Sequence, residues 1–298
     1  MAEITAALVK ELRERTGSGM MECKRALQET GGDIETAVEL MRKAGQAKAD
    51  KKASRVAAEG LIVVRQAAGA VAMAKINCKT DFVTKNDDFR AFAAEVAETV
   101  LREGPADLDA LLAAVMANGQ SVDRNRRDCI AKIGENINVR RGVRLTTAAG
   151  VLGSYLHGTR IGVLVELDGG DADLAKDIAM HIAASRPLCV SADQVPAELI
   201  AKEKEIYAAQ AAEEAKDKPA NVIDKIIEKI VEGKLRKYFE SATLLGQPFV
   251  KDDKQSVGDL LKSRKARVVR FERFELGEGI EKKSSDFAAE VAAARGDD

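Results

Sequence analysis

The sequence contains no tryptophan, and aromatic residues make up only 4% of its 298 positions. We therefore expect a hydrophobic core built mainly from alanine, valine, leucine and isoleucine. No apolar run approaches the roughly 20 residues that a helix needs to cross a bilayer, so no membrane partner is expected. The N-terminal segment 1–17 mixes both charge signs and lacks the pattern of a secretory signal peptide. A cytoplasmic protein is the simplest interpretation.

An excess of charge of one sign is also missing, because the formal net charge is only −1. Charged residues make up 32% of the chain and hydrophobic residues 46%, which is typical of folded globular proteins. Nucleic-acid binding requires clustered lysine and arginine that displace counterions, so no direct nucleic-acid partner is expected. The lysine-rich segment 43–55 leaves a nucleic-acid-binding protein as one alternative, which steeply salt-dependent RNA binding would reveal.

Familiar catalytic patterns are absent. The sequence has no GxxxxGK[ST], GxGxxG, GxSxG or HExxH pattern, and its two histidines, His157 and His181, are far apart. The four cysteines form no CxxC pair, so reduced thiols are favoured over disulfides or a zinc site. We expect no catalytic residue, no cofactor and no metal site. An unrecognised enzyme stays open as an alternative, because an unknown chemistry leaves no known motif.

Residues 1–45 have the pattern of three short helices. Apolar residues recur at helical spacing from Ile4 to Leu12. Gly31 and Gly32 are placed to end the second helix, since glycine accepts the left-handed conformation found there. Asp33 is then placed to cap the third helix. Residues 46–59 are rich in alanine and lysine and are interpreted as a solvated helical linker.

The central part of the chain mixes strand-like and helical runs in separate groups, which favours an α+β fold over a doubly wound α/β fold. Strands are predicted at 61–65, 71–76, 137–146, 150–156, 160–167 and 267–276. Helices are predicted from Asp87 or Asp88 with Phe89, Phe92, Ala93, Val96 and Val100 facing inward, and at 107–117, 122–134 and 171–184.

Residues 196–242 predict a helical hairpin with a turn at 216–219. The second arm is strongly apolar at helical spacing, from Val222 to Phe239, which is typical of antiparallel coiled-coil packing. Strand-like sequence resumes after the hairpin, so it is interpreted as an insertion. The tail from Glu281 onward is predicted to form a short docking helix.

The segment 77–83 (NCKTDFV) follows a predicted strand and precedes a predicted helix, so it is expected to be a loop. Taken alone, Phe82 is most simply a core anchor and Asp81 a helix cap. Alternatively, an Asp-Phe pair at a loop tip can act as a probe, with the aromatic ring wedged into a partner and the carboxylate against its polar groups.

Seven segments resemble the elongation factor Ts family, in order and over almost the whole chain. Ser18 and Glu22 are conservative departures from its pattern. The matching segments are LVKELRERTGSGMMECKR at 8–25, TDFV at 80–83, AKIGENINVRR at 131–141, GSYLHG at 153–158, HIAASRP at 181–187, LLGQPFV at 244–250 and RFELGEGIE at 273–281.

The resemblance implies a modular α+β fold. It consists of an N-terminal three-helix domain resembling ubiquitin-associated domains, a core of two related subdomains, an antiparallel helical hairpin (coiled coil) serving dimerization, and a C-terminal helical module. The implied ranges are 1–55 for the N-terminal domain and linker, 56–140 for the first core subdomain, 141–187 and 243–276 for the second, 188–242 for the hairpin and 277–298 for the C-terminal module.

The resemblance also implies a function in protein biosynthesis without covalent chemistry: guanine nucleotide exchange on the translation GTPase EF-Tu. Members bind EF-Tu·GDP and promote GDP release. By analogy, Thr80, Asp81, Phe82 and Val83 form the loop that displaces Mg²⁺ from the partner. A homodimer or a two-to-two complex through the hairpin is a further expectation.

A second set of residues, Arg13, Met20, Met21 and Lys24, matches the family's contact surface for the EF-Tu G domain. The methionines are equally consistent with a core position, and Arg13 and Lys24 with solvated charge. His157 is interpreted as a turn residue for which a contact role stays open. A scaffold or chaperone of EF-Tu that uses the same surfaces without accelerating exchange is the remaining alternative.

Overall fold

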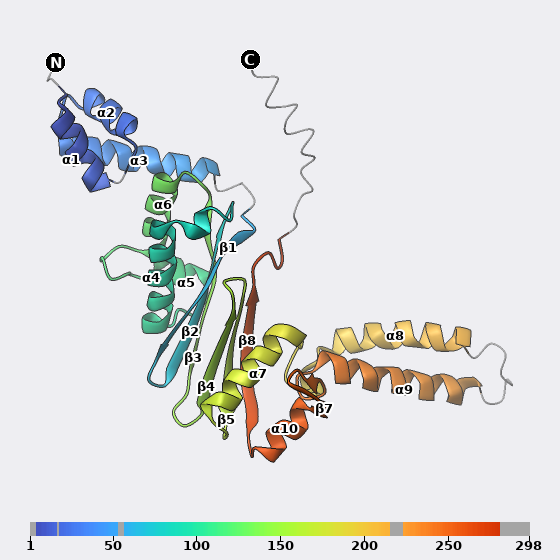
Figure 1. Ribbon diagram of the computed structural model, residues 1–298. Coiled ribbons are helices and arrows are strands. Elements are labelled where there is room, and N and C mark those ends of the chain that lie inside the picture. The colour runs from blue at the N-terminus through green and yellow to red at the C-terminus, as the bar shows by residue number, and fades with distance from the viewer. Residues whose placement is uncertain (1–3, 17, 53–56, 215–222, 281–298) are drawn as a thin grey trace.

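The computed structural model describes residues 4–16, 18–52, 57–214 and 223–280. Figure 1 shows an elongated molecule with three N-terminal helices at one end, two sheets in the middle and a long helical hairpin that projects from the far side. Strands and helices occur in separate runs and all strand pairs of the two larger sheets are antiparallel. The α+β class predicted from the sequence is therefore confirmed.

The N-terminal end is a three-helix unit, as predicted. Gly31 and Gly32 both have positive φ and end the second helix. Asp33 caps the third helix, because its carboxylate accepts a hydrogen bond from the backbone N of Thr36 at 2.6 Å, and this bond lowers the pKa of Asp33. The small buried core includes Leu12, Cys23 and Leu27. The helices are α1 (Ala6–Thr16), α2 (Met20–Glu29) and α3 (Ile34–Lys52).

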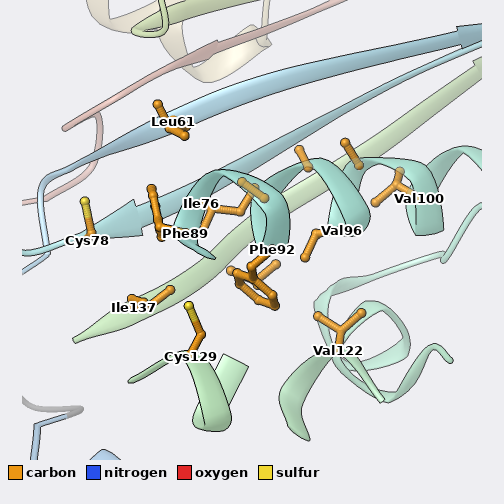
Figure 2. Packing of buried hydrophobic residues seen from close by; sticks show 14 of the residues in the cluster. Leu61, Ile76, Cys78, Phe89, Phe92, Val96, Val100, Val122, Cys129 and Ile137 are labelled. Carbon is orange, nitrogen blue, oxygen red and sulfur yellow. The ribbon is translucent and has the colours of Figure 1, made fainter. Parts of the chain in front are cut away.

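The first sheet has three antiparallel strands in the order β1-β2-β3, with helices packed on one face. The predicted inward residues of α4 are all buried. Figure 2 shows Phe89, Phe92 and Val96 gathered with Ile76 of β2 and Cys129 of α6. The elements are β1 (Glu59–Ala67), β2 (Ala70–Cys78), α4 (Asp87–Glu103), α5 (Leu108–Ala113), α6 (Val122–Ile133) and β3 (Ile137–Thr146).

The second sheet, in the order β4-β5-β8, is covered by α7, and its last strand comes from the end of the described chain. Its core joins Val163 and Val165 of β5 to Ile178 and Ile182 of α7. The elements are β4 (Val151–His157), β5 (Ile161–Asp168), α7 (Ala172–Ser185) and β8 (Arg267–Glu275). Three short elements were not anticipated from the sequence: β6 (Pro248–Phe249), β7 (Asp252–Ser256) and α10 (Val257–Ser263).

The two sheets pack against each other through a shared core that includes Ile62, Met73, Leu164 and Phe274. The side chain of Lys75 is buried in this region, and its Nζ donates a hydrogen bond to the backbone O of Glu275 at 2.5 Å. Burial lowers the pKa of the Lys75 ammonium group. The two sheets thus form a continuous body.

One boundary expected from the sequence is misplaced. A division between residues 140 and 141 falls inside β3, which continues to pair with β2 as far as Thr146. The shift has a physical reason: a strand keeps its partners as long as its alternate side chains face a core, and Val143 and Leu145 face the core between the sheets.

The predicted helical hairpin is formed by α8 (Ala197–Glu214) and α9 (Ile223–Ala242), after the short 3₁₀ helix η2 (Ala192–Gln194). The two long helices lie side by side (Figure 1). Lys234 of α9 contacts Gln210 and Glu214 of α8 at 3.0 and 2.7 Å. The predicted turn at 216–219 and the predicted docking helix beyond Glu281 lie outside the described residues.

Candidate functional site

The loop that follows β2 is tightly turned. After Thr80 the chain enters a single turn of 3₁₀ helix, η1 (Val83–Lys85), and then α4. The helix cap is Asn86, whose side-chain oxygen accepts hydrogen bonds from the backbone N of Asp88 at 3.0 Å and of Phe89 at 3.2 Å. Short polar side chains are favoured at this position because they satisfy free amides of the first turn.

Phe82 and Asp81 lie at the tip of this loop. The side chain of Phe82 is 76% exposed, so the core-anchor interpretation is wrong. Asp81 is exposed as well, and Asn86 rather than Asp81 caps α4. Val83 points inward instead and is only 6% exposed. One buried aliphatic residue therefore anchors a loop whose aromatic and acidic side chains face outward.

Thr80, at the base of the loop, is held by a residue that the sequence did not single out. Its backbone N donates to Oε2 of Glu135 at 3.1 Å, and its hydroxyl lies 3.0 Å from each carboxylate oxygen of Glu135. Glu135 lies between α6 and β3, 55 residues away along the chain. No local sequence pattern could have identified this contact.

Cys78, the last residue of β2, supports Thr80 from the other side. Its Sγ donates a hydrogen bond to the backbone O of Thr80 at 3.1 Å. Burial, together with the carboxylates of Glu135, Glu59 and Asp81, raises the pKa of the Cys78 thiol to about 12. The group therefore stays protonated at neutral pH and remains a donor.

The second candidate set lies on α1 and α2. Arg13 and Lys24 are exposed, and the side chains of Met20 and Met21 are 60% and 70% exposed. The core interpretation of the two methionines is therefore wrong. The apolar side of α2 is formed instead by Cys23, Ala26 and Leu27.

The two candidate sets lie at the same end of the core. Helix α3 of the N-terminal unit packs against α6, and Figure 1 shows the three N-terminal helices beyond the end of α6. Glu135 follows that end of α6 and binds Thr80. The tertiary structure thus brings segments near residues 20 and 80 to one region.

The two histidines lie in different environments. His157 is exposed at the end of β4, with its Nδ1 3.5 Å from the hydroxyl of Tyr155. His181 is buried, and burial lowers its pKa.

Among the described residues, no group of three or more histidine, cysteine, aspartate or glutamate side chains is arranged to hold a metal ion. No helix within the described ranges is long and apolar enough to span a membrane.

Comparisons with known proteins agree on one family. The family model for elongation factor Ts matches residues 79–278. An elongation factor Ts from Methylococcus capsulatus is 62% identical over 97% of this chain and 98% of its own length. One from Thioalkalivibrio sulfidiphilus is 60% identical, with the same shares of the two chains covered. One from Alkalilimnicola ehrlichii is 56% identical over 98% of this chain and 99% of its own length.

Proposed function

Because this chain belongs to the elongation factor Ts family, we propose that it is a translation elongation factor that acts as a guanine nucleotide exchange factor for EF-Tu. It binds EF-Tu·GDP, promotes release of GDP and leaves when GTP binds. The observation that carries this proposal is the outward display of Asp81 and Phe82 on a braced loop. An exposed aromatic side chain at a loop tip is well suited to contact a partner, because it can fill a pocket on the partner's surface.

The chemistry of the proposed step is displacement rather than bond making. Bound Mg²⁺ neutralises the phosphates of GDP and is the largest local charge in such a site. Phe82 wedges into the G domain of EF-Tu and Asp81 engages polar groups beside it, which disturbs the Mg²⁺ position. GDP then loses a large part of its electrostatic stabilisation and dissociates.

Exchange follows from thermodynamic coupling between the two binding events. If the factor binds nucleotide-free EF-Tu more tightly than the GDP form, nucleotide must weaken factor binding by the same ratio. Equal affinity for the two forms would shift nothing. The direction of the cycle is set by the supply of GTP, and the chain needs no catalytic residue or cofactor of its own.

A second contact surface on the N-terminal helices completes the proposal. Arg13, Met20, Met21 and Lys24 bind the G domain of EF-Tu, with the methionines supplying adaptable apolar contact and the basic residues electrostatic attraction. This unit is the proposed ubiquitin-associated-like domain. The factor works in the cytoplasm, where its partner acts.

The hairpin of α8 and α9 is proposed to mediate a further contact, either with a second copy of the chain or with another domain of EF-Tu. Half-buried apolar residues along α9, such as Ile226 and Ile230, supply the surface. Sedimentation of the chain alone and with EF-Tu distinguishes a homodimer, a two-to-two complex and a one-to-one complex.

The proposed function is tested by loading EF-Tu with fluorescent GDP and following its release after addition of excess unlabelled nucleotide. Wild-type protein should accelerate release strongly, and the double variant Asp81→Ala/Phe82→Ala should lose most of that acceleration. The matched control is Leu108→Ala/Asp109→Ala, an exposed apolar and acidic pair on α5, which should behave as wild type.

The outcomes separate the candidate mechanisms. Acceleration that survives in the Asp81→Ala/Phe82→Ala variant would keep the exchange function but assign it to the N-terminal surface. Binding of EF-Tu without any acceleration by the wild type would favour the scaffold alternative instead.

A further inference from the structure

We propose that Glu135 is a positioning residue for nucleotide exchange. Its carboxylate fixes the base of the loop so that Asp81 and Phe82 meet the partner in one prearranged geometry. The inference rests on the proposed function of residues 80–83. It assigns the loop's activity partly to a side chain that lies outside the loop and is itself only half exposed.

The position of Glu135 follows from the register of the first sheet. Cys78 at the end of β2 faces Ile137 at the start of β3 in an antiparallel ladder. Thr80 lies two residues beyond Cys78 and Glu135 lies two residues before Ile137, so the two residues face each other just past the end of the ladder. The ladder ends there because the chain after Thr80 turns into η1, and the carboxylate of Glu135 takes over the bonding that a continued strand would supply.

The chain before Glu135 is set up for this contact. Helix α6 ends at Ile133, and Gly134 adopts a left-handed conformation with φ 88°. The backbone N of Gly134 donates to the O of Ile130 at 2.8 Å. The turn at Gly134 redirects the chain from the helix toward β3, so Glu135 arrives beside Thr80 instead of continuing the helix.

Both ends of the exposed tip are held. On the N-terminal side, Glu135 binds the backbone N and the hydroxyl of Thr80. The Cys78 thiol donates a hydrogen bond to the backbone O of Thr80. On the C-terminal side, the backbone O of Asp81 accepts a bond from the N of Thr84 at 3.1 Å. The side chains of Asp81 and Phe82 face outward at the tip between these two points.

Prearrangement is what makes this bracing functional. A flexible loop holds the geometry that displaces Mg²⁺ in only a fraction of the bound complexes, because ordering the loop costs conformational freedom. GDP release at saturating factor is then slowed by that fraction. A loop already held in its docking geometry avoids this slowing. Hydrogen bonds to a charged carboxylate are among the stronger ones, so Glu135 is well suited to keep the loop in place.

The experiment measures GDP release from EF-Tu as a function of factor concentration for Glu135→Ala, Glu135→Gln and Thr80→Val. It yields the maximal stimulated rate and the concentration of half-maximal effect. Phe82→Ala is measured in parallel to test the proposed function itself. The matched control is Glu95→Ala, because Glu95 is also half-buried and also accepts a backbone bond, from the N of Ala117 at 3.0 Å, but it does not contact the loop.

We expect Glu135→Ala to lower the maximal rate on the order of tenfold, as for loss of strong hydrogen bonds to a charged group. Glu135→Gln should recover part of the rate, because its carbonyl oxygen still accepts. Thr80→Val should lower the rate less and should add little on top of Glu135→Ala, since both act through one contact. Glu95→Ala should keep the wild-type maximal rate.

A purely structural role gives a different result. Loss of folded protein lowers the effective concentration and moves the half-maximal point, but it leaves the rate at saturation unchanged. Such a result for Glu135→Ala would overturn the inference. An unchanged maximal rate for Glu135→Ala would also overturn it, provided that the separate variant Phe82→Ala is impaired. If Phe82→Ala itself had no effect, the proposed function of the loop would fail before Glu135 came into question.

Discussion

The ring nitrogen Nε2 of His181 lies 2.9 Å from the side-chain oxygen Oε1 of Gln247, in the interior of the second sheet unit. The other ring nitrogen, Nδ1, accepts a bond from the backbone N of Val250 at 3.2 Å. Nε2 must therefore carry the proton and donate to Gln247. The amide of Gln247 is oriented in turn by bonds from its Nε2 to the backbone O of Ser185 and Ser241, at 3.2 and 2.7 Å.

This arrangement makes stability depend on pH. Burial lowers the pKa of His181 below its usual value of 6.5, and the bond to Gln247 opposes that only in part. Between the folded and unfolded pKa values the unfolded chain binds more protons, so the free energy of unfolding falls as pH drops below about 6.5. We expect urea midpoints to decrease from pH 7.5 to pH 5.5.

The variant His181→Gln should flatten that pH dependence, even though its overall stability is lower. His157→Gln, which changes an exposed histidine, should retain the wild-type slope. An equally steep slope in His181→Gln would assign the effect to other groups.

Two phenylalanines seven residues apart should respond oppositely to the same substitution. Phe89 is fully buried in the first sheet core, so Phe89→Ala should lower the free energy of unfolding by about 3–5 kcal/mol. Phe82 is mostly exposed, so Phe82→Ala should change stability by less than about 0.5 kcal/mol while impairing GDP release. Chemical denaturation followed by circular dichroism measures both. A large loss of stability in Phe82→Ala would mean that the loop is part of the core.

Removing the exposed methionines should weaken binding to EF-Tu. Met20→Ala/Met21→Ala deletes apolar surface that is buried only in the complex, and the affinity should fall at least about fivefold. Surface-bound EF-Tu and a concentration series of each variant give the dissociation constant. The control is Val115→Ala, which truncates an apolar residue that is 54% exposed and lies outside the N-terminal helices. Equal affinities for all three proteins would remove the methionines from the contact surface.

The four cysteines should differ in reactivity. Burial raises the pKa of Cys78 and Cys129 to about 12, and Cys23 is buried in the N-terminal unit. Cys189 is the least buried of the four, although burial raises its pKa as well. Because the thiolate is the reactive form, Ellman's reagent should modify Cys189 first in the native protein. Cys189→Ser should remove that fastest phase, and urea should make all remaining thiols reactive.

Local patterns were sufficient for most of the secondary structure. The glycines that end α2, the Asp33 cap and the inward residues of α4 were all predicted, because each depends on backbone preference or on helical spacing over a few residues. The short elements β6, β7 and α10 were missed. They span too few residues to show a hydrophobic periodicity in the sequence. Their position depends on packing against α7 and the end of α9.

The candidate site divides in the same way. The segment TDFV could be singled out from the sequence, together with its place between a strand and a helix. Whether Phe82 faces inward or outward could not, because a single aromatic residue in a loop has no periodicity to orient it. The contact between Thr80 and Glu135 was equally hidden, since it joins residues 55 positions apart.

The sequence by itself therefore determined the family, the α+β class and the order of the elements, because these depend on motifs and on apolar spacing that are local to the chain. Only the tertiary structure decided that Phe82, Met20 and Met21 are exposed and that Glu135 braces the loop. Each of these depends on which distant segments the fold places side by side, and burial and pairing are properties of that arrangement.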